Sequence, residues 1–200
     1  MEIASAPVWQ AVTTSDPRFA RSEPLVAGYV LTDWLTGEEP DCAPIIQTLL
    51  DRLHEAGGGA LFCPAGDYVC RTPITVPIGV TLLGEWERPN GHDPVGGTVL
   101  VYRGPARSEE FDTPFISLTH SSCIRGVTFW YPEQSPDNVT AYPTTIEMYH
   151  VDRVENVTLV NAYRGITAPY PMSCPNIESV YGTPIASGIE MIACSDQWEM

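Results

Sequence analysis

The stretch AGGGALFCPAGDYVCRTPITVPIGVTLLGE, residues 56–85, decides the fold of this 200-residue chain. Three consecutive glycines lead into a series of very short β-prone segments, each bounded by Gly, Pro, Asp or Asn. These segments are 60–63, 68–70, 74–76, 80–83 and, after a longer loop, 99–102. No helical period returns after the glycines, so the pattern predicts a ladder of short strands.

The residues before the three glycines predict a single amphipathic helix. Asp41 is the expected N-cap, and Pro44 falls in the first turn, where its missing N–H costs little. Apolar residues recur at helical spacing and make one continuous stripe: Ile45, Ile46, Leu49, Leu50 and Leu53. The glycines at 57–59 then end the helix and let the backbone reverse.

A loose internal repeat follows the ladder. The segments 116–129 (ISLTHSSCIRGVTF), 146–159 (IEMYHVDRVENVTL) and 166–182 (ITAPYPMSCPNIESVYG) each open on an isoleucine that starts a short apolar strand. Each then turns into a second, alternating strand, and a further start stands at Ile189. Such units bury an apolar face only by stacking. A β-sandwich has strands of similar length, but the repeated strand pair with its bend favours a β-solenoid.

Residues 28 to about 196 resemble the N-terminal portion of the pectate-lyase superfamily. The shared pattern is an Asp, an amphipathic helix, three glycines, Pro-x-Gly-x-Tyr and a Val-Thr-Leu-x-Gly coil. In this chain it is carried by Asp41, Gly57, Gly58, Gly59, Pro64, Gly66, Tyr68 and the run Val80–Gly84. The resemblance implies an all-β fold, a single-stranded right-handed parallel β-helix (a β-solenoid). The amphipathic helix would be its N-terminal cap over the open sheet edge.

This reading predicts two regions. Residues 1–27 are an irregular N-terminal arm, and residues 28–200 are the N-terminal part of a right-handed β-helix domain. We expect the domain to continue further, because the final SDQWEM does not read as a cap. The catalytic motifs of polygalacturonases and pectate lyases are missing from the chain, so the resemblance transfers no catalytic residue.

The charge composition limits the classes of molecule that the chain is expected to bind. A net charge of −15, from 25 acidic and 10 basic residues, argues against nucleic acid and against anionic membrane surfaces. An anionic glycan would be repelled unless Ca²⁺ or a local basic patch intervened, so we expect a neutral or mildly charged polysaccharide. Apart from Ca²⁺, which stays open, no cofactor or metal is expected, because the six cysteines include no CxxC pair. Cys63 and Cys70 would form a disulfide only in a secreted chain.

The sequence leaves the location open. No apolar run approaches the ~20 residues of a membrane span, and MEIASAPVWQ has no signal-peptide pattern. The protein is therefore expected to be secreted or at the cell surface if a signal precedes this chain, and cytoplasmic otherwise.

Acids at equivalent positions of neighbouring coils are candidate catalytic residues. Glu147 and Glu190 each follow the isoleucine that opens a coil, and Asp196 ends the last one. Coils stack about 4.8 Å apart, so such carboxylates fall near the separations that glycoside hydrolysis needs. His150 and His120 occupy the same place in successive coils, which makes His150 a candidate general acid or base. The plainer alternative is a row of surface acids beside a stacked polar ladder.

Four aromatic residues are candidates for binding a sugar. Trp130, Tyr131, Tyr149 and Tyr163 lie in or near the coil turns, and aromatic faces pack well against the C–H face of a sugar ring. The alternative is packing inside the solenoid.

By resemblance, we expect a carbohydrate-active β-helix protein. It would be part of a glycoside hydrolase or polysaccharide lyase that acts on a polysaccharide by carboxylate acid–base chemistry. Two alternatives stay open. One is a non-catalytic glycan-binding module of tailspike type, which would form a homotrimer. The other is a structural cap whose active site lies in further sequence.

Overall fold

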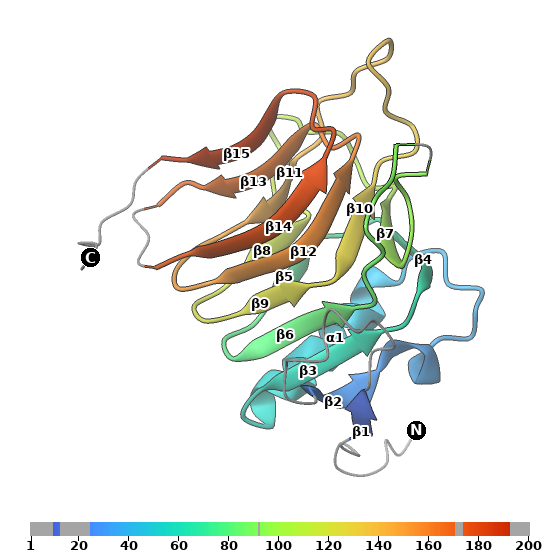
Figure 1. The fold of residues 1–200 in the computed structure, drawn as a ribbon, viewed down its shortest axis with the longest axis vertical. Helices are drawn as coiled ribbons and strands as arrows, with labels where there is room; N and C mark the ends of the chain where they lie inside the picture. The colour runs from blue at the N-terminus through green and yellow to red at the C-terminus, as the bar shows by residue number, and fades with distance from the viewer. Residues whose placement is uncertain (1–9, 13–24, 92, 171–173, 193–200) are drawn as a thin grey trace.

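A computed structural model describes residues 10–12, 25–91, 93–170 and 174–192. Within these ranges the chain forms one α-helix, α1 (Ala43–Glu55), a short 3₁₀ helix, η2 (Leu31–Trp34), and mostly parallel strands. None of the helices in the described ranges has the length and apolarity of a membrane span. Figure 1 shows the strands stacked one above another, with α1 at the lower end beside β3.

The strands fall into three rows of parallel neighbours. Row A contains β2 (Leu25–Val30), β3 (Gly59–Cys63), β6 (Val80–Gly84), β9 (Cys123–Arg125) and the first halves of β12 (Arg153–Val160) and β14 (Asn176–Gly182). Row B contains β4 (Gly66–Cys70), β7 (Thr98–Tyr102), β10 (Val127–Trp130) and the second halves of β12 and β14. Row C contains β5 (Ile74–Val76), β8 (Ile116–Leu118), β11 (Thr144–Glu147), β13 (Arg164–Ala168) and β15 (Ser187–Met191).

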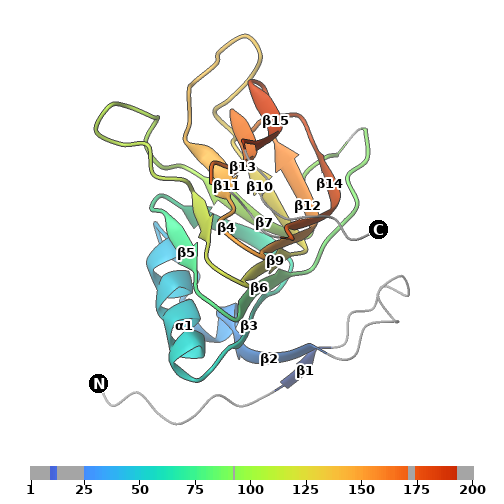
Figure 2. The same cartoon turned by 90° about the vertical axis from the view of Figure 1, so that its left-hand side faces the viewer.

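The chain visits rows A, B and C in turn and then starts again. We number these passages as coils 1 to 5, and they span residues 59–76, 80–118, 123–147, 153–168 and 176–191. A chain that returns to the same three rows, with each coil pairing in parallel with the one before, is consistent with a parallel β-helix. Figure 2 views the stack from the side and shows the loops that leave it between rows.

The core is a set of ladders in which like residues stack. In row C the inward isoleucines of successive coils are direct partners: Ile74, Ile116, Ile146, Ile166 and Ile189. The first four are at most 1% exposed, whereas Ile189 in coil 5 is 50% exposed. Row A has its own aliphatic ladder of Leu61, Leu82, Ile124 and Val154. The prediction that an isoleucine opens each repeat at the same place is confirmed.

The helix confirms the predicted apolar stripe but corrects its cap. Helix α1 buries Ile46, Leu49, Leu50 and Leu53 against the first coils, while its N-cap is Cys42 rather than Asp41. The Asp41 carboxylate still accepts the N–H of Ala43 at 3.0 Å, and it also accepts the N–H of Arg71 at 2.9 Å. Asp41 therefore lies one residue before the N-cap, and from there its carboxylate connects the start of the helix to coil 1.

One further expectation is corrected. Part of the arm expected to be irregular forms strands, because β1 (Gln10–Val12) pairs antiparallel with β2, which begins at Leu25. This pairing occupies the backbone groups at the edge of row A. Cys63 and Cys70 are buried free thiols, so no disulfide joins them.

In coils 3, 4 and 5 the bend between rows A and B is a single residue in left-handed conformation. Gly126, Asn156 and Ser179 occupy this position in successive coils, with φ of 75°, 53° and 54°. Glycine and asparagine accept this conformation at low cost. The strand direction therefore changes within one residue, and β12 and β14 run through the bend from row A into row B.

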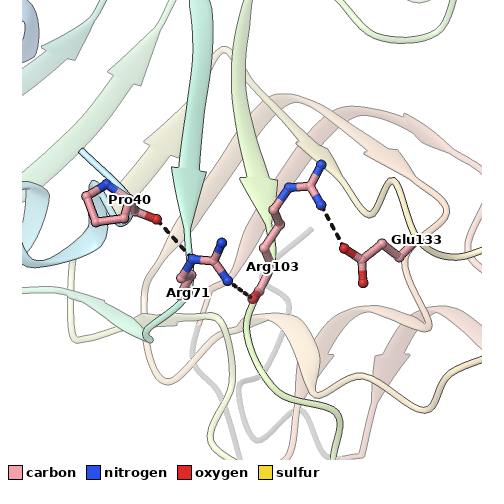
Figure 3. A network of polar contacts seen from close by, with 4 residues as sticks. All are labelled: Pro40, Arg71, Arg103 and Glu133. Atoms are coloured by element: carbon pink, nitrogen blue, oxygen red, sulfur yellow. Dashed lines mark hydrogen bonds and ion pairs between the residues drawn. The ribbon is translucent and has the colours of Figure 1, made fainter. Parts of the chain in front are cut away.

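Two arginines, Arg71 and Arg103, make hydrogen bonds and an ion pair at the corner between rows B and C (Figure 3). Arg71 donates from Nε to the carbonyl of Pro40 at 3.0 Å and from a terminal nitrogen to the carbonyl of Arg103 at 3.4 Å. Arg103 in turn pairs with Glu133 at 2.7 Å. These exposed contacts join the segment before α1 to coils 1, 2 and 3, although each alone adds little stability.

Truncation of one ladder residue tests this packing. Ile116→Ala removes a fully buried side chain from the middle of the row C ladder, so we expect a loss of about 2–5 kcal/mol in the free energy of unfolding. The neighbouring outward residue supplies the control, since Ser117→Ala should change it by less than about 0.5 kcal/mol. Urea denaturation followed by circular dichroism measures both, and equal losses would contradict the ladder.

Candidate functional site

An open pocket of about 390 Å³ lies on the outer surface of row A. Its lining comes from coils 2, 3 and 4 and from the turns that lead into row A: Thr81, Ser121, Ser122, Cys123, Arg125, Val151, Arg153 and Glu155. Outward residues of a strand alternate with inward ones, so Thr81, Cys123 and Arg153 stand in one column. Arg125 and Glu155 stand in the next column.

Two guanidinium groups flank the one carboxylate that lines this pocket. Glu155 lies 3.7 Å from Nε of Arg125 and 3.7 Å from a terminal nitrogen of Arg153. Both contacts are longer than a charge-assisted hydrogen bond of about 2.8 Å. The Glu155 side chain is mostly buried, at 18% exposed, whereas that of Arg153 is 63% exposed. The lining of the pocket therefore contains two basic residues and one acidic residue, in a chain of net charge −15.

A buried carboxylate shapes the turn that enters the pocket from row C. Asp152 is fully buried, and its carboxylate accepts the N–H groups of Tyr149 at 2.7 Å, His150 at 3.0 Å and Ser122 at 3.3 Å. Burial raises the pKa of Asp152 above its usual value, although these hydrogen bonds oppose the rise. Because backbone groups of two coils occupy it, Asp152 serves to position the turn.

The same turn contains strained backbone. Val151 has φ of 55° and Ser121, at the equivalent place in the coil below, has φ of 59°. The left-handed region is unfavourable for a β-branched side chain such as that of Val151. The N–H of Ser121 donates to the carbonyl of His150 at 3.1 Å, so the two turns are bonded to each other.

Paired rings stand in the turn that precedes the pocket. The rings of His120 and His150 are 4.8 Å apart and nearly perpendicular, which confirms that the two histidines occupy the same place in successive coils and shows that they meet edge to face. Tyr149 pairs in the same way with Tyr170, at 5.7 Å. Tyr149 and Tyr170 are 54% and 51% exposed, so their rings offer accessible apolar area beside the turn.

Glu147 and Glu190 lie in one outward column of row C, outside the pocket. Thr167 stands between them, because it pairs with Glu147 on one side and with Glu190 on the other. Two coil spacings of about 4.8 Å therefore separate their backbones. Burial, with a smaller contribution from the charge of Asp112, raises the pKa of Glu147. Glu190 is exposed.

The other predicted residues lie in several places. Tyr131 is only 1% exposed, its ring packs on Tyr102 and its hydroxyl is bonded to Thr145, so its predicted contact with a sugar is corrected to a core role. Trp130 is partly exposed but ends β10 in row B, away from Tyr149 and His150. Tyr163 packs partly buried against the core. Asp196 lies outside the described residues.

The sequence reasoning missed the two arginines of the pocket. Arg125 and Arg153 stand in CIRG and DRVEN, the same segment of two aligned repeats. The chain has only ten basic residues, and two of them stand in equivalent repeat segments. This coincidence was a usable signal for a basic site on the stacked coils. In the described ranges, no group of three or more His, Cys, Asp or Glu residues is arranged to hold a metal ion.

Comparisons with known proteins find matches only among solved structures. No protein-family model matches the chain, and no curated protein matches it in sequence. Similar solved structures include the A-modules of the mannuronan C-5 epimerases AlgE4 and AlgE6 of Azotobacter vinelandii. Both are 16% identical, with TM-scores of 0.46 and 0.42, over 82% and 80% of this chain. The chain spans about half the length of these modules, 54% and 57%.

A third similar structure is a protein of Parabacteroides merdae that carries the provisional name glycosyl hydrolase. It is 12% identical, with a TM-score of 0.35, over 85% of this chain and 99% of that one.

The strained turn makes a stability prediction. Val151→Gly should raise the free energy of unfolding by about 1 kcal/mol, because glycine adopts positive φ without the steric cost of a β-branched residue. Val139→Gly is the control, since Val139 is exposed in a loop without positive φ and should gain nothing. Thermal and urea unfolding measure both variants, and destabilisation by Val151→Gly would contradict the assignment of strain.

Proposed function

We propose that the chain is a right-handed, single-stranded parallel β-helix whose first coil is capped by α1, and that it acts on a polysaccharide. The resemblance of residues 28 to about 196 to the pectate-lyase superfamily motivates the proposal. The three parallel rows and the contacts of α1 with β3, β5 and β6 support it.

The pocket of row A is the proposed binding site, and an acidic sugar unit is its proposed occupant. The observation that carries this is the position of Arg125 and Arg153 on either side of Glu155. Guanidinium groups bind carboxylates by paired, charge-assisted hydrogen bonds. The acidic surface of the chain would repel an anionic polymer at long range, and these arginines supply the local basic patch that such a ligand needs.

The chemistry that fits this pocket is β-elimination. Arg125 and Arg153 would neutralise the sugar carboxylate and so make the neighbouring C–H more acidic. Glu155 would accept that proton as general base. The electrons of the C–H bond form a C=C bond as the bond to the glycosidic oxygen breaks, and water protonates the departing oxygen. The products are a new chain end and an unsaturated sugar.

A second candidate is hydrolysis by Glu147 and Glu190 in row C. The raised pKa of Glu147 suits a general acid, and the exposed Glu190 suits a base that activates water. Their separation by one intervening coil falls near the upper end of the spacing of inverting enzymes, roughly 6.5–9.5 Å. His150, next to the pocket turn, remains a further candidate acid or base.

One assay separates these chemistries. The protein is incubated with polygalacturonate, alginate and a neutral glucan, in Ca²⁺ or in chelator, because the resemblance leaves this ion open. Ultraviolet absorbance reports the unsaturated product, and a reducing-end assay reports any cleavage. We expect absorbance to rise when the wild type is given an acidic polymer. In Glu155→Gln the rate of this rise should be at least about 100-fold lower, the size expected for loss of a general base.

The matched control is Glu178→Gln. Glu178 pairs with Glu155 one coil further along but does not line the pocket, so this variant should keep the wild-type rate. Reducing ends without absorbance, abolished by Glu147→Gln and not by Glu155→Gln, would overturn the elimination proposal in favour of hydrolysis. Binding without cleavage, lost in Arg125→Ala, would indicate a non-catalytic glycan-binding module.

A further inference from the structure

The segment between β6 and β7 lies across the outside of the stack, and the structure describes it on both sides of residue 92. In Figure 2 it runs up the right-hand side beside β14. Its base is closed, because the N–H of Glu85 donates to the hydroxyl of Thr98 and the N–H of Thr98 donates to the carbonyl of Glu85, both at 2.8 Å. Its return arm is fastened to coil 3, where the hydroxyl of Thr128 donates to the carbonyl of Gly96 at 3.0 Å.

Trp86 in this segment reaches over three coils. Its backbone nitrogen lies 3.5 Å from the point where a Cβ would stand on Gly126 in coil 3. Its indole Nε1 donates to the hydroxyl of Thr158 in coil 4 at 3.0 Å. Its ring lies 5.6 Å from that of Tyr181 in coil 5, with 35° between the planes. The two rings therefore form a tilted, partly exposed aromatic pair, which we call the Trp86–Tyr181 platform.

The platform borders the pocket across the single-residue bend between rows A and B. Gly126, against which Trp86 packs, directly follows Arg125 of the pocket. Thr158, which accepts the indole N–H, follows Glu155 by three residues. The pocket and the platform thus lie on the two sides of the same bend, the pocket on coils 2 to 4 and the platform extending from Trp86 across coils 3 and 4 to Tyr181 in coil 5.

We propose that the Trp86–Tyr181 platform is a second sugar subsite, which stacks the unit next to the acidic unit held in the pocket. This rests on the proposed function. Indole and phenol faces pack against the apolar C–H face of a pyranose ring. The platform is held in place by a hydrogen bond and a closed loop, so binding orders few groups and loses little entropy.

Arg88 gives the subsite a preference. Its guanidinium lies over the Tyr181 ring, 5.5 Å from the centroid. A carboxylate at the edge of a sugar stacked on the platform would therefore lie near the Arg88 guanidinium. The platform should favour a second acidic unit over a neutral one.

The test compares a monosaccharide with an oligomer, because a merely structural clamp would affect both alike. Galacturonate and its trimer are titrated by calorimetry into the wild type, Tyr181→Leu, Thr158→Val and Arg125→Ala. Tyr181→Leu removes one ring of the platform. Thr158→Val tests the support of the platform, because it removes the hydrogen bond of the Trp86 indole and keeps both rings.

We expect Tyr181→Leu to weaken trimer binding about three- to ten-fold and to leave monosaccharide binding unchanged. Thr158→Val should weaken trimer binding by less than Tyr181→Leu does and leave monosaccharide binding unchanged, and Arg125→Ala should weaken both. Equal trimer affinity in the wild type and Tyr181→Leu, with both ligands still dependent on Arg125, would overturn the subsite but not the pocket. A wild type that binds neither ligand would overturn the proposed function itself. Thermal unfolding of each variant shows whether it is folded, and Trp86→Phe replaces Tyr181→Leu if that variant is not.

Discussion

Each coil of this protein places its side chains where the coil below places its own, because parallel strands pair residue with residue about 4.8 Å apart. A residue at an inward position must therefore pack well against the same type of side chain in the next coil. The isoleucines of row C meet this condition from Ile74 to Ile166, and an aliphatic ladder does the same in row A. A shift of one residue in any coil would turn its apolar side chains outward. The register that builds the core also aligns every outward residue.

The outer surface inherits that alignment, and the three rows differ in what they do with it. Row A is open and carries the pocket, in which Arg125 lies against Glu155 because their coils are in register. Row B is overlaid by the segment that contains Trp86. Row C presents Glu147 and its column of polar residues. Two of the ten basic residues of the chain, Arg125 and Arg153, thus stand together on row A.

The features of the fold that follow from local pattern were accessible in the sequence. The stripe from Ile46 to Leu53 predicts the helix, and the opening isoleucines predict the register, because both depend only on spacing. The cap was misplaced by one residue, since Asp41 bonds the helix and Arg71 together, a contact over 30 positions that no local rule contains. Tyr131 was misread for a related reason. An aromatic residue at the end of a strand faces the core or the solvent according to the path of the loop that follows it.

The candidate site was less predictable, because it is made between coils. Glu155 meets Arg153 of its own strand and Arg125 of the neighbouring strand, and the second contact exists only when the coils are stacked. Trp86 stands in a long insertion, far in sequence from its partner Tyr181. Inserted loops escape repeat analysis because they break its period. The ladders of like residues can thus be predicted from one sequence. The residues of a site on the outer surface can be predicted only after the register of the coils is known.

The most direct test of the account is a crystal structure of the protein with a bound galacturonate oligomer. The account predicts a sugar carboxylate on row A, with oxygens about 2.7–2.9 Å from the guanidinium groups of Arg125 and Arg153. The carbon next to that carboxylate should face Glu155. An oligomer bound instead along row C, over Glu147 and Glu190 with the pocket empty, would contradict it.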